Sequence, residues 1–154
     1  MPSTHYVGKA GHLAVMGEFC LRGYNVSMPE IDKGDDVFVV NDETGAMWRL
    51  QVKTSTGAKQ NTSRKYQFRI RESQIQQPQS PELHFVFALR KINRWRFLVM
   101  DRAVLRNYVL NQSLGTGAAP YRHFVFVLND DGRCICSGVD LKNHIGDWAT
   151  WPSL

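Results

Sequence analysis

Hydrophobic and polar positions alternate along much of the chain, and this period of two predicts β-strands. In residues 65–71 the alternation is strict, so one face of the predicted strand is apolar and the other is polar and basic. Apolar runs at 85–89 and 124–128 have the length of buried strands rather than of long helices. The pattern therefore indicates a chain built largely around a β-sheet.

Two pairs of apolar segments are separated by short turns and predict β-hairpins. The first hairpin runs from Asp36 to Thr54 and turns at 41–45, where Asn, Asp and Gly cluster. The second pairs 83–89 with 95–100 through the polar turn at 91–94. Further strands are expected at 24–28, 65–71 and 123–128, and the polar stretch 55–63 is expected to be a loop.

Helical periodicity appears in three segments. Residues 9–22 carry apolar side chains at spacings of three, four and seven, and Gly23 follows as a C-terminal cap. Asp101 is placed to cap a second helix that ends near residue 111. A last helix is expected over 139–148. The sequence contains no internal repeat and no linker long enough to divide it, so residues 1–154 are expected to form one α/β domain.

Composition narrows the class of protein. The 154 residues are 43% hydrophobic and 21% charged, which suits a folded domain with a substantial core. No apolar run approaches the length of a membrane span, and the first residues lack a secretory pattern. The three cysteines, an odd number without framework spacing, favour a reduced protein. We therefore expect a soluble, cytoplasmic protein with no membrane partner.

Charge is distributed unevenly along the chain. The net charge is +5, but residues 53–106 hold twelve Lys and Arg against only three Asp and Glu. Residues 1–52 are net acidic, with seven Asp and Glu against four Lys and Arg. A basic middle beside an acidic front suggests a surface for a polyanion next to a carboxylate cluster, although a solvated basic face without a partner has the same pattern.

The first hairpin brings three polar residues together. Its turn centres near residue 44, so the antiparallel partner of Asp36 falls around 51–53. Gln51 and Lys53 have the same parity and leave the sheet on one face. A carboxylate, an amide and an ammonium group within an otherwise apolar pair of strands cost stability, which points to a site.

This set of groups suits metal-assisted hydrolysis of a phosphodiester. The Asp36 carboxylate, the Gln51 amide oxygen and the Val52 main-chain oxygen are the hard ligands that Mg²⁺ prefers. A bound ion neutralises phosphate charge and lowers the pKa of a water, and Lys53 could hold that water. Glu18, on the first predicted helix, could complete the ion's shell directly or through water.

Short motifs in a fixed order strengthen this interpretation. They are Gly17-Glu18, Gly23-Tyr24-Asn25-Val26, Asp32-x-Gly34-x-Asp36-Val37 and Gln51-Val52-Lys53-Thr54. The run resembles the PD-(D/E)XK nuclease superfamily, and within it the variants in which Gln-x-Lys replaces the acidic-x-Lys signature. Holliday-junction resolvases, restriction-type enzymes and a bacterial group I intron homing endonuclease share this layout.

The resemblance implies an α-β-β-β-α-β core, a central mixed sheet flanked by helices, and Mg²⁺-dependent cleavage of DNA, with Mn²⁺ able to substitute. It implies that Asp36 and Gln51 are metal ligands, that Lys53 is the catalytic lysine and that Glu18 is the helix carboxylate. Asp35 stands where the motif has proline, so Asp35 or Asp32 remains an alternative ligand. Gln51 leaves the pocket with one negative charge fewer, which could weaken metal binding or mark a lapsed catalyst.

The basic residues after the hairpin are candidates for phosphate contact. They are Lys59, Arg64, Lys65, Arg69 and Arg71, with Arg90, Lys91, Arg94 and Arg96 as weaker candidates. The five histidines show no metal-ligand spacing and are interpreted as structural, although His12 lies near the helix site.

Three functions remain open from the sequence. The first is a Mg²⁺-dependent DNA endonuclease, and the second is a nucleic-acid-binding or regulatory protein on the same fold without catalysis. The third is a protein-interaction domain such as an immunity protein. Because two strands require two active sites, a homodimer or higher homo-oligomer is expected, with the 83–100 hairpin or the 148–151 tail as possible interfaces.

Overall fold

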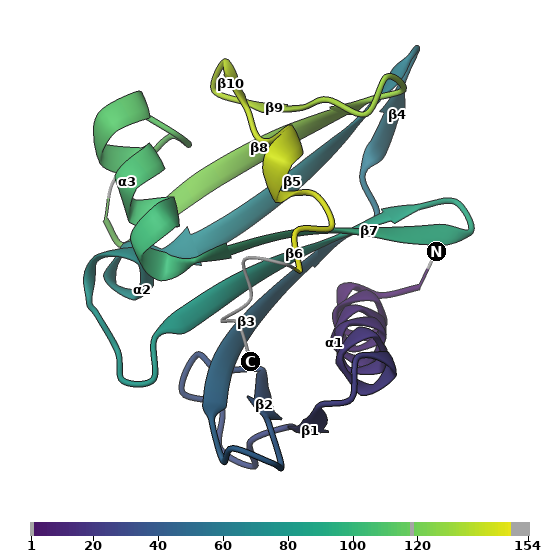
Figure 1. Ribbon diagram of the computed structural model, residues 1–154. Coiled ribbons are helices and arrows are strands. Elements are labelled where there is room, and N and C mark those ends of the chain that lie inside the picture. The colour runs from purple at the N-terminus through teal and green to yellow at the C-terminus, as the bar shows by residue number, and fades with distance from the viewer. Residues whose placement is uncertain (1, 118, 149–154) are drawn as a thin grey trace.

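The two predicted hairpins join side by side in a mixed five-stranded sheet, called the first sheet here (Figure 1). Its strands, in spatial order, are β1 (Asn25–Ser27), β2 (Val37–Val40), β3 (Met47–Ser55), β6 (Leu83–Lys91) and β7 (Arg94–Asp101). The parallel pairing of β3 with β6 connects the hairpins, and the other pairs are antiparallel. The computed structural model describes residues 2–117 and 119–148.

A second, antiparallel sheet packs against one face of the first. Its strands, in spatial order, are β10 (Val139–Asp140), β9 (Cys134–Cys136), β8 (Tyr121–Asn129), β5 (Ser63–Arg71) and β4 (Ala58–Gln60). The predicted strands 65–71 and 123–128 form its centre. The expectation of a loop over 55–63 was wrong in part, because β4 pairs with β5 there.

The helices lie outside the sheets. They are α1 (Thr4–Leu21), α2 (Glu72–Gln76) and α3 (Arg102–Gln112), with a short 3-10 helix η1 (Lys142–His144). Asp101 caps α3 as predicted, since its side chain accepts a hydrogen bond of 2.7 Å from the Val104 N–H. The expected helix over 139–148 was wrong. Val139 pairs with Cys136 there, because a tight turn returns the chain to β9.

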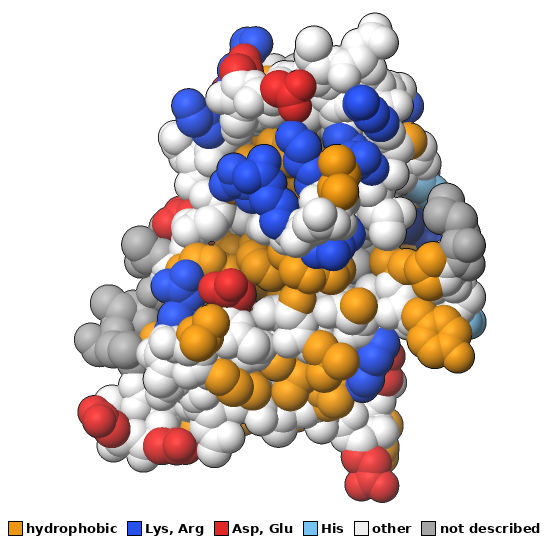
Figure 2. Space-filling view, turned by 90° about the vertical axis from the view of Figure 1, so that its right-hand side faces the viewer, with side chains coloured by type: hydrophobic (Ala, Val, Ile, Leu, Met, Phe, Trp, Pro, Cys, Tyr) orange, Lys and Arg blue, Asp and Glu red, His pale blue; other side chains and the backbone are white. Residues whose placement is uncertain are grey.

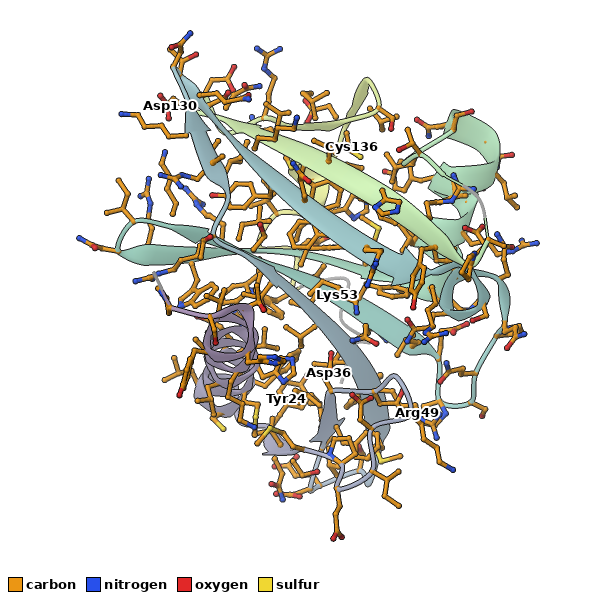
Figure 3. The ribbon with its side chains drawn as sticks, turned by 180° about the vertical axis from the view of Figure 1, so that it is seen from behind. Tyr24, Asp36, Arg49, Lys53, Asp130 and Cys136 are labelled. Atoms are coloured by element: carbon orange, nitrogen blue, oxygen red, sulfur yellow. The ribbon has the colours of Figure 1, made fainter. Side chains whose placement is uncertain are left out.

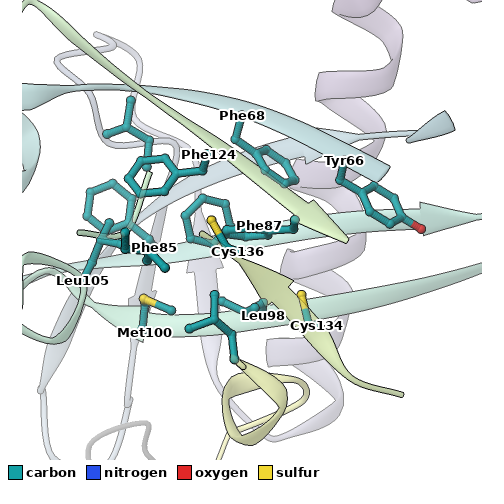
Figure 4. Close-up of a cluster of buried hydrophobic side chains, with 14 of the residues drawn as sticks. Tyr66, Phe68, Phe85, Phe87, Leu98, Met100, Leu105, Phe124, Cys134 and Cys136 are labelled. Atoms are coloured by element: carbon teal, nitrogen blue, oxygen red, sulfur yellow. The ribbon is translucent and has the colours of Figure 1, made fainter. Parts of the chain in front are cut away.

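Aromatic side chains fill the space between the two sheets (Figure 4). The Phe87 ring lies 4.8 Å from Phe126 and 5.1 Å from Phe68, measured between ring centroids. Such pairs contribute about 0.5–1.5 kcal/mol each beyond the burial of their area. The strands of the hairpin 83–100 therefore supply much of the core. Of the 148–151 tail, only Trp148 lies within the described residues.

A smaller core lies between α1 and the other face of the first sheet. Val15 and Phe19 of α1 pack against alternate residues of β3, β6 and β7. Gly11 allows the helix to approach closely, because a Cβ at this position would lie 1.9 Å from the Thr54 hydroxyl of β3. The central mixed sheet flanked by helices is thus confirmed. Among the described residues, no helix has the length and apolar character needed to cross a membrane.

Candidate active site

Asp36 directly precedes β2 and is held by the first hairpin. Its backbone N–H donates to the Leu50 carbonyl oxygen at 2.7 Å, which places residue 36 beside residue 51, as the turn predicted. The Asp36 Oδ2 accepts a 2.7 Å hydrogen bond from the Val52 N–H and another from the Gln51 amide. The position of the carboxylate therefore depends on the register of two neighbouring strands.

Gln51 and Lys53 lie on the face of β3 that is turned away from α1. The intervening Val52 packs in the core beneath α1, and β-strand alternation directs residues 51 and 53 to the opposite side. Figure 3 shows Asp36 and Lys53 close to one another beside β3. One hairpin thus brings together the acid, the amide and the amine that the sequence predicted.

Gln74 of α2 extends this cluster. Its Nε2 donates to the Gln51 Oε1 at 2.8 Å and to the Gly34 carbonyl oxygen at 3.2 Å. Gly34 has a φ of +102°, and a Cβ there would lie 2.5 Å from the Gln74 Nε2, so glycine is required for this contact. No sequence pattern pointed to Gln74, because it lies in a polar segment whose helix is too short to show a hydrophobic period.

Burial shifts the proton affinity of both charged groups. It raises the pKa of the Asp36 carboxyl, although His12, the Val52 N–H and Lys53 act in the opposite direction. Burial likewise lowers the pKa of the Lys53 ammonium. The carboxylates of Asp36 and Asp32 act in the opposite direction, and the guanidinium groups of Arg69 and Arg71 add to the lowering. A bound cation would offset the free-energy cost of burying the charged carboxylate. A bound phosphate would likewise offset the cost of burying the charged ammonium group.

The cluster opens into a pocket of about 740 Å³ between β3, β5 and α2. Arg69 and Arg71 of β5 line it together with Tyr121. The Arg69 guanidinium lies 4.4 Å from the centre of the Tyr121 ring, and that of Arg71 lies 5.3 Å from it. The pocket therefore combines two carboxylates with four cationic side chains, Lys33 included, and is suited to a phosphate ester.

The structure does not bring Glu18 to this pocket. Glu18 lies 3.5 Å from Arg22 one turn later on α1, and the helix residue that approaches the site is His12. The six-residue separation corresponds to about 9 Å along the axis and about 240° of rotation, so the two side chains leave different faces of the helix. Among the alternatives to Asp36, Asp35 lies 3.8 Å from Arg49 and lines a neighbouring hollow, whereas Asp32 lines the main pocket.

The predicted phosphate contacts divide into two groups. Lys65 shares its strand face with Arg69 and Arg71 by alternation. Arg64 has the opposite parity, and its guanidinium donates to the carbonyl oxygens of residues 56 and 57, while Lys59 lies beside it on β4. These two residues lie nearer the end of the β6–β7 hairpin, and Figure 2 shows Lys and Arg gathered at that end above a band of hydrophobic side chains.

The donor atoms fit a hard divalent cation. In the described part of the chain, no three His, Cys, Asp or Glu side chains form a metal-binding group, so amide or main-chain oxygens must contribute. Gln51 can supply such an oxygen when its amide and that of Gln74 both turn, because the Gln51 oxygen then faces Asp36 while its NH₂ group donates to the Gln74 oxygen. The buried Asp36 carboxylate supplies the charge.

Comparison with known proteins supports the fold. No family model and no curated protein matches the chain by sequence. Among solved structures, a bacterial homing endonuclease, I-Ssp6803I, matches with a TM-score of 0.52 and 19% identity over 70% of this chain and 74% of its own. Hjc of Archaeoglobus fulgidus, a Holliday junction resolvase from an archaeal hyperthermophile, matches with a TM-score of 0.46 and 13% identity over 75% and 81%. The chain has the restriction-endonuclease-like fold.

Proposed function

We propose that the chain is a metal-dependent endonuclease that hydrolyses phosphodiester bonds of DNA. The observation that carries this proposal is the convergence of Asp36, Gln51 and Lys53 in a pocket lined by Arg69 and Arg71. The likeness in fold to a homing endonuclease is consistent with it. Asp36, Gln51 and the Val52 carbonyl oxygen would hold Mg²⁺, or Mn²⁺ in its place.

The bound cation would neutralise charge on the scissile phosphate and lower the pKa of a water. Lys53 would orient the attacking water and donate a hydrogen bond to the phosphoryl oxygen on which negative charge develops. Its position beside the buried Asp36 supports this role, because an ammonium group in a partly dehydrated pocket acts strongly on such an oxygen.

The outer face of β5 would follow the DNA backbone. Lys65, Arg69 and Arg71 lie on this face, and residues two apart on a strand are separated by about 7 Å. Each can contact a different phosphate, so together they would position the backbone across the pocket without reading its sequence. Cleavage of both strands requires a second site, so we expect a homodimer.

The test is cleavage of supercoiled, linear, single-stranded and four-way-junction DNA in Mg²⁺, Mn²⁺ or EDTA. We expect metal-dependent cuts from the wild type and from Lys142→Ala, which removes an exposed lysine far along the chain, but none from Lys53→Ala. Salt-sensitive binding without cuts in any of these ions would instead identify a binding protein on a nuclease fold. The absence of salt-sensitive DNA binding would favour a protein-interaction domain.

A further inference from the structure

The side chain of His12 approaches the candidate metal site from α1. Its Nε2 lies 3.7 Å from the Asp36 Oδ2, and the ring makes no hydrogen bond to any other residue that the structure describes. The close packing of Gly11 against Thr54 brings this turn of α1 down onto β3. The imidazole is 23% exposed and lines the pocket itself, so its ring nitrogen is accessible to an ion there.

The separation of the two atoms permits a shared ion. Nitrogen and oxygen ligands lie about 2.1 Å from a first-row transition metal, so two donors on one ion are at most about 4.2 Å apart. The 3.7 Å between Nε2 and Oδ2 is within this limit. At 3.7 Å the two atoms also lie beyond hydrogen-bond distance of each other, so an ion bound to both would not have to replace a hydrogen bond between them.

We infer that His12 is a nitrogen ligand of the divalent cation and that the site consequently prefers Mn²⁺, Co²⁺ or Ni²⁺ to Mg²⁺. The inference rests on the proposed function for the existence of the metal site. Oxygen ligands alone suit Mg²⁺, whereas an imidazole adds affinity along the series from Mn²⁺ to Ni²⁺. His12 would also supply the second strong ligand that Gln51, without charge, does not.

The experiment measures metal binding to the complete chain without DNA. Calorimetric titration should show tighter binding of Co²⁺ than of Mg²⁺ by the wild type. His12→Ala and the larger, polar His12→Gln should each weaken Co²⁺ binding at least about tenfold and leave Mg²⁺ binding nearly unchanged. His5→Ala removes an exposed histidine of the same helix and should change neither affinity.

Pulsed electron paramagnetic resonance of the Mn²⁺-loaded protein gives a direct readout. Coupling to ¹⁴N should be present in the wild type and in His5→Ala and absent from both His12 variants, whose folding is checked by circular dichroism. A wild type that binds Mn²⁺ without ¹⁴N coupling, or an unchanged ratio of Co²⁺ to Mg²⁺ affinity in the variants, would overturn the inference. Cleavage with oxygen-only coordination would refute only the role of His12, and nitrogen coordination without cleavage would refute only the nuclease proposal.

Discussion

The Gln74 side chain donates a hydrogen bond of 2.8 Å to the Gln51 Oε1 and thereby connects α2 to the candidate metal site. The same amide group also donates to the Gly34 carbonyl oxygen at 3.2 Å, in the turn that leads into Asp36. Gln74 thus holds Gln51, one candidate metal ligand, and also the turn that precedes Asp36, the other candidate. It is a positioning residue, because it acts through Gln51.

Removal of this contact should slow cleavage without weakening DNA binding. Gln74→Ala leaves the Gln51 amide without its partner, so we expect kcat to fall about 10–100-fold while KM changes little. Gln112→Ala, at an exposed position of α3, is the control and should behave as the wild type. A fall in kcat/KM that came entirely from KM would assign Gln74 to substrate binding instead.

Replacement of Gln51 by glutamate should strengthen metal binding and weaken the metal-free fold. The new carboxylate would face the buried Asp36, and two like charges so close together in a partly buried site repel each other. A divalent cation removes this repulsion, so Gln51→Glu should gain more thermal stability from Mg²⁺ than the wild type does. Melting temperatures with EDTA and with saturating Mg²⁺ measure both effects, and equal gains in the two proteins would contradict the assignment of Gln51 to the metal site.

Lys53→Met should abolish cleavage and stabilise the protein. The pKa of Lys53 is lowered by burial, so its charged form costs free energy at neutral pH, and this cost diminishes only as the pH rises through the lowered pKa. A methionine of similar length carries no charge, and we expect a gain of about 1 kcal/mol in the free energy of unfolding, measured with urea at neutral pH. The gain should shrink in alkaline buffer, where the wild-type ammonium loses its proton.

The salt dependence of DNA binding should show whether the basic face of β5 contacts DNA phosphates. If Arg69 and Arg71 each contact a phosphate, their joint replacement by alanine should reduce the slope of log K against log salt by about 1.8. Replacement of Arg133, whose guanidinium pairs with Asp131 in a distant turn, should leave the slope unchanged. An unaltered slope in the double variant would remove β5 from the DNA interface.

The parts of the site that the sequence could predict depend on local rules. The turn at 41–45 sets the register of β2 and β3, so the proximity of Asp36 to Gln51 follows from counting residues. Strand alternation similarly places Gln51 and Lys53 on one face. These relationships need no knowledge of the rest of the fold.

The errors concern relationships that depend on tertiary packing. The choice between Glu18 and His12 depends on which face of α1 meets the sheet, and that is decided by the contact of Gly11 with Thr54. Strand β4 is exposed along its whole length and has no apolar alternation to reveal it. Gln74 joins the site only because α2, which follows β5, brings its side chain within hydrogen-bond distance of Gln51 on β3, a tertiary contact that no sequence pattern indicated.

The ion pair between Glu82 and Arg102 should stabilise the segment that carries Gln74, and this effect should be lost in acid. Arg102 donates two hydrogen bonds of 2.8 Å to the Glu82 carboxylate and one of 3.0 Å to the Ile75 carbonyl oxygen in α2. Burial acts to raise the pKa of Glu82, but these hydrogen bonds and the charge of Arg102 outweigh it and hold the pKa below its ordinary value. The contribution is therefore present above the ordinary pKa of glutamate and disappears as the pH falls through the lowered value.

Glu82→Gln should consequently reduce the free energy of unfolding at neutral pH by about 2 kcal/mol, since hydrogen bonds to charged groups are lost from a buried guanidinium. The difference from the wild type should narrow towards zero as urea denaturation is repeated down to about pH 3, below the ordinary pKa of glutamate. Glu30→Gln, at an exposed position, should show no difference at any pH. A deficit that stayed constant with pH would mean that packing, and not the charge of Glu82, holds α2 and Gln74 over the site.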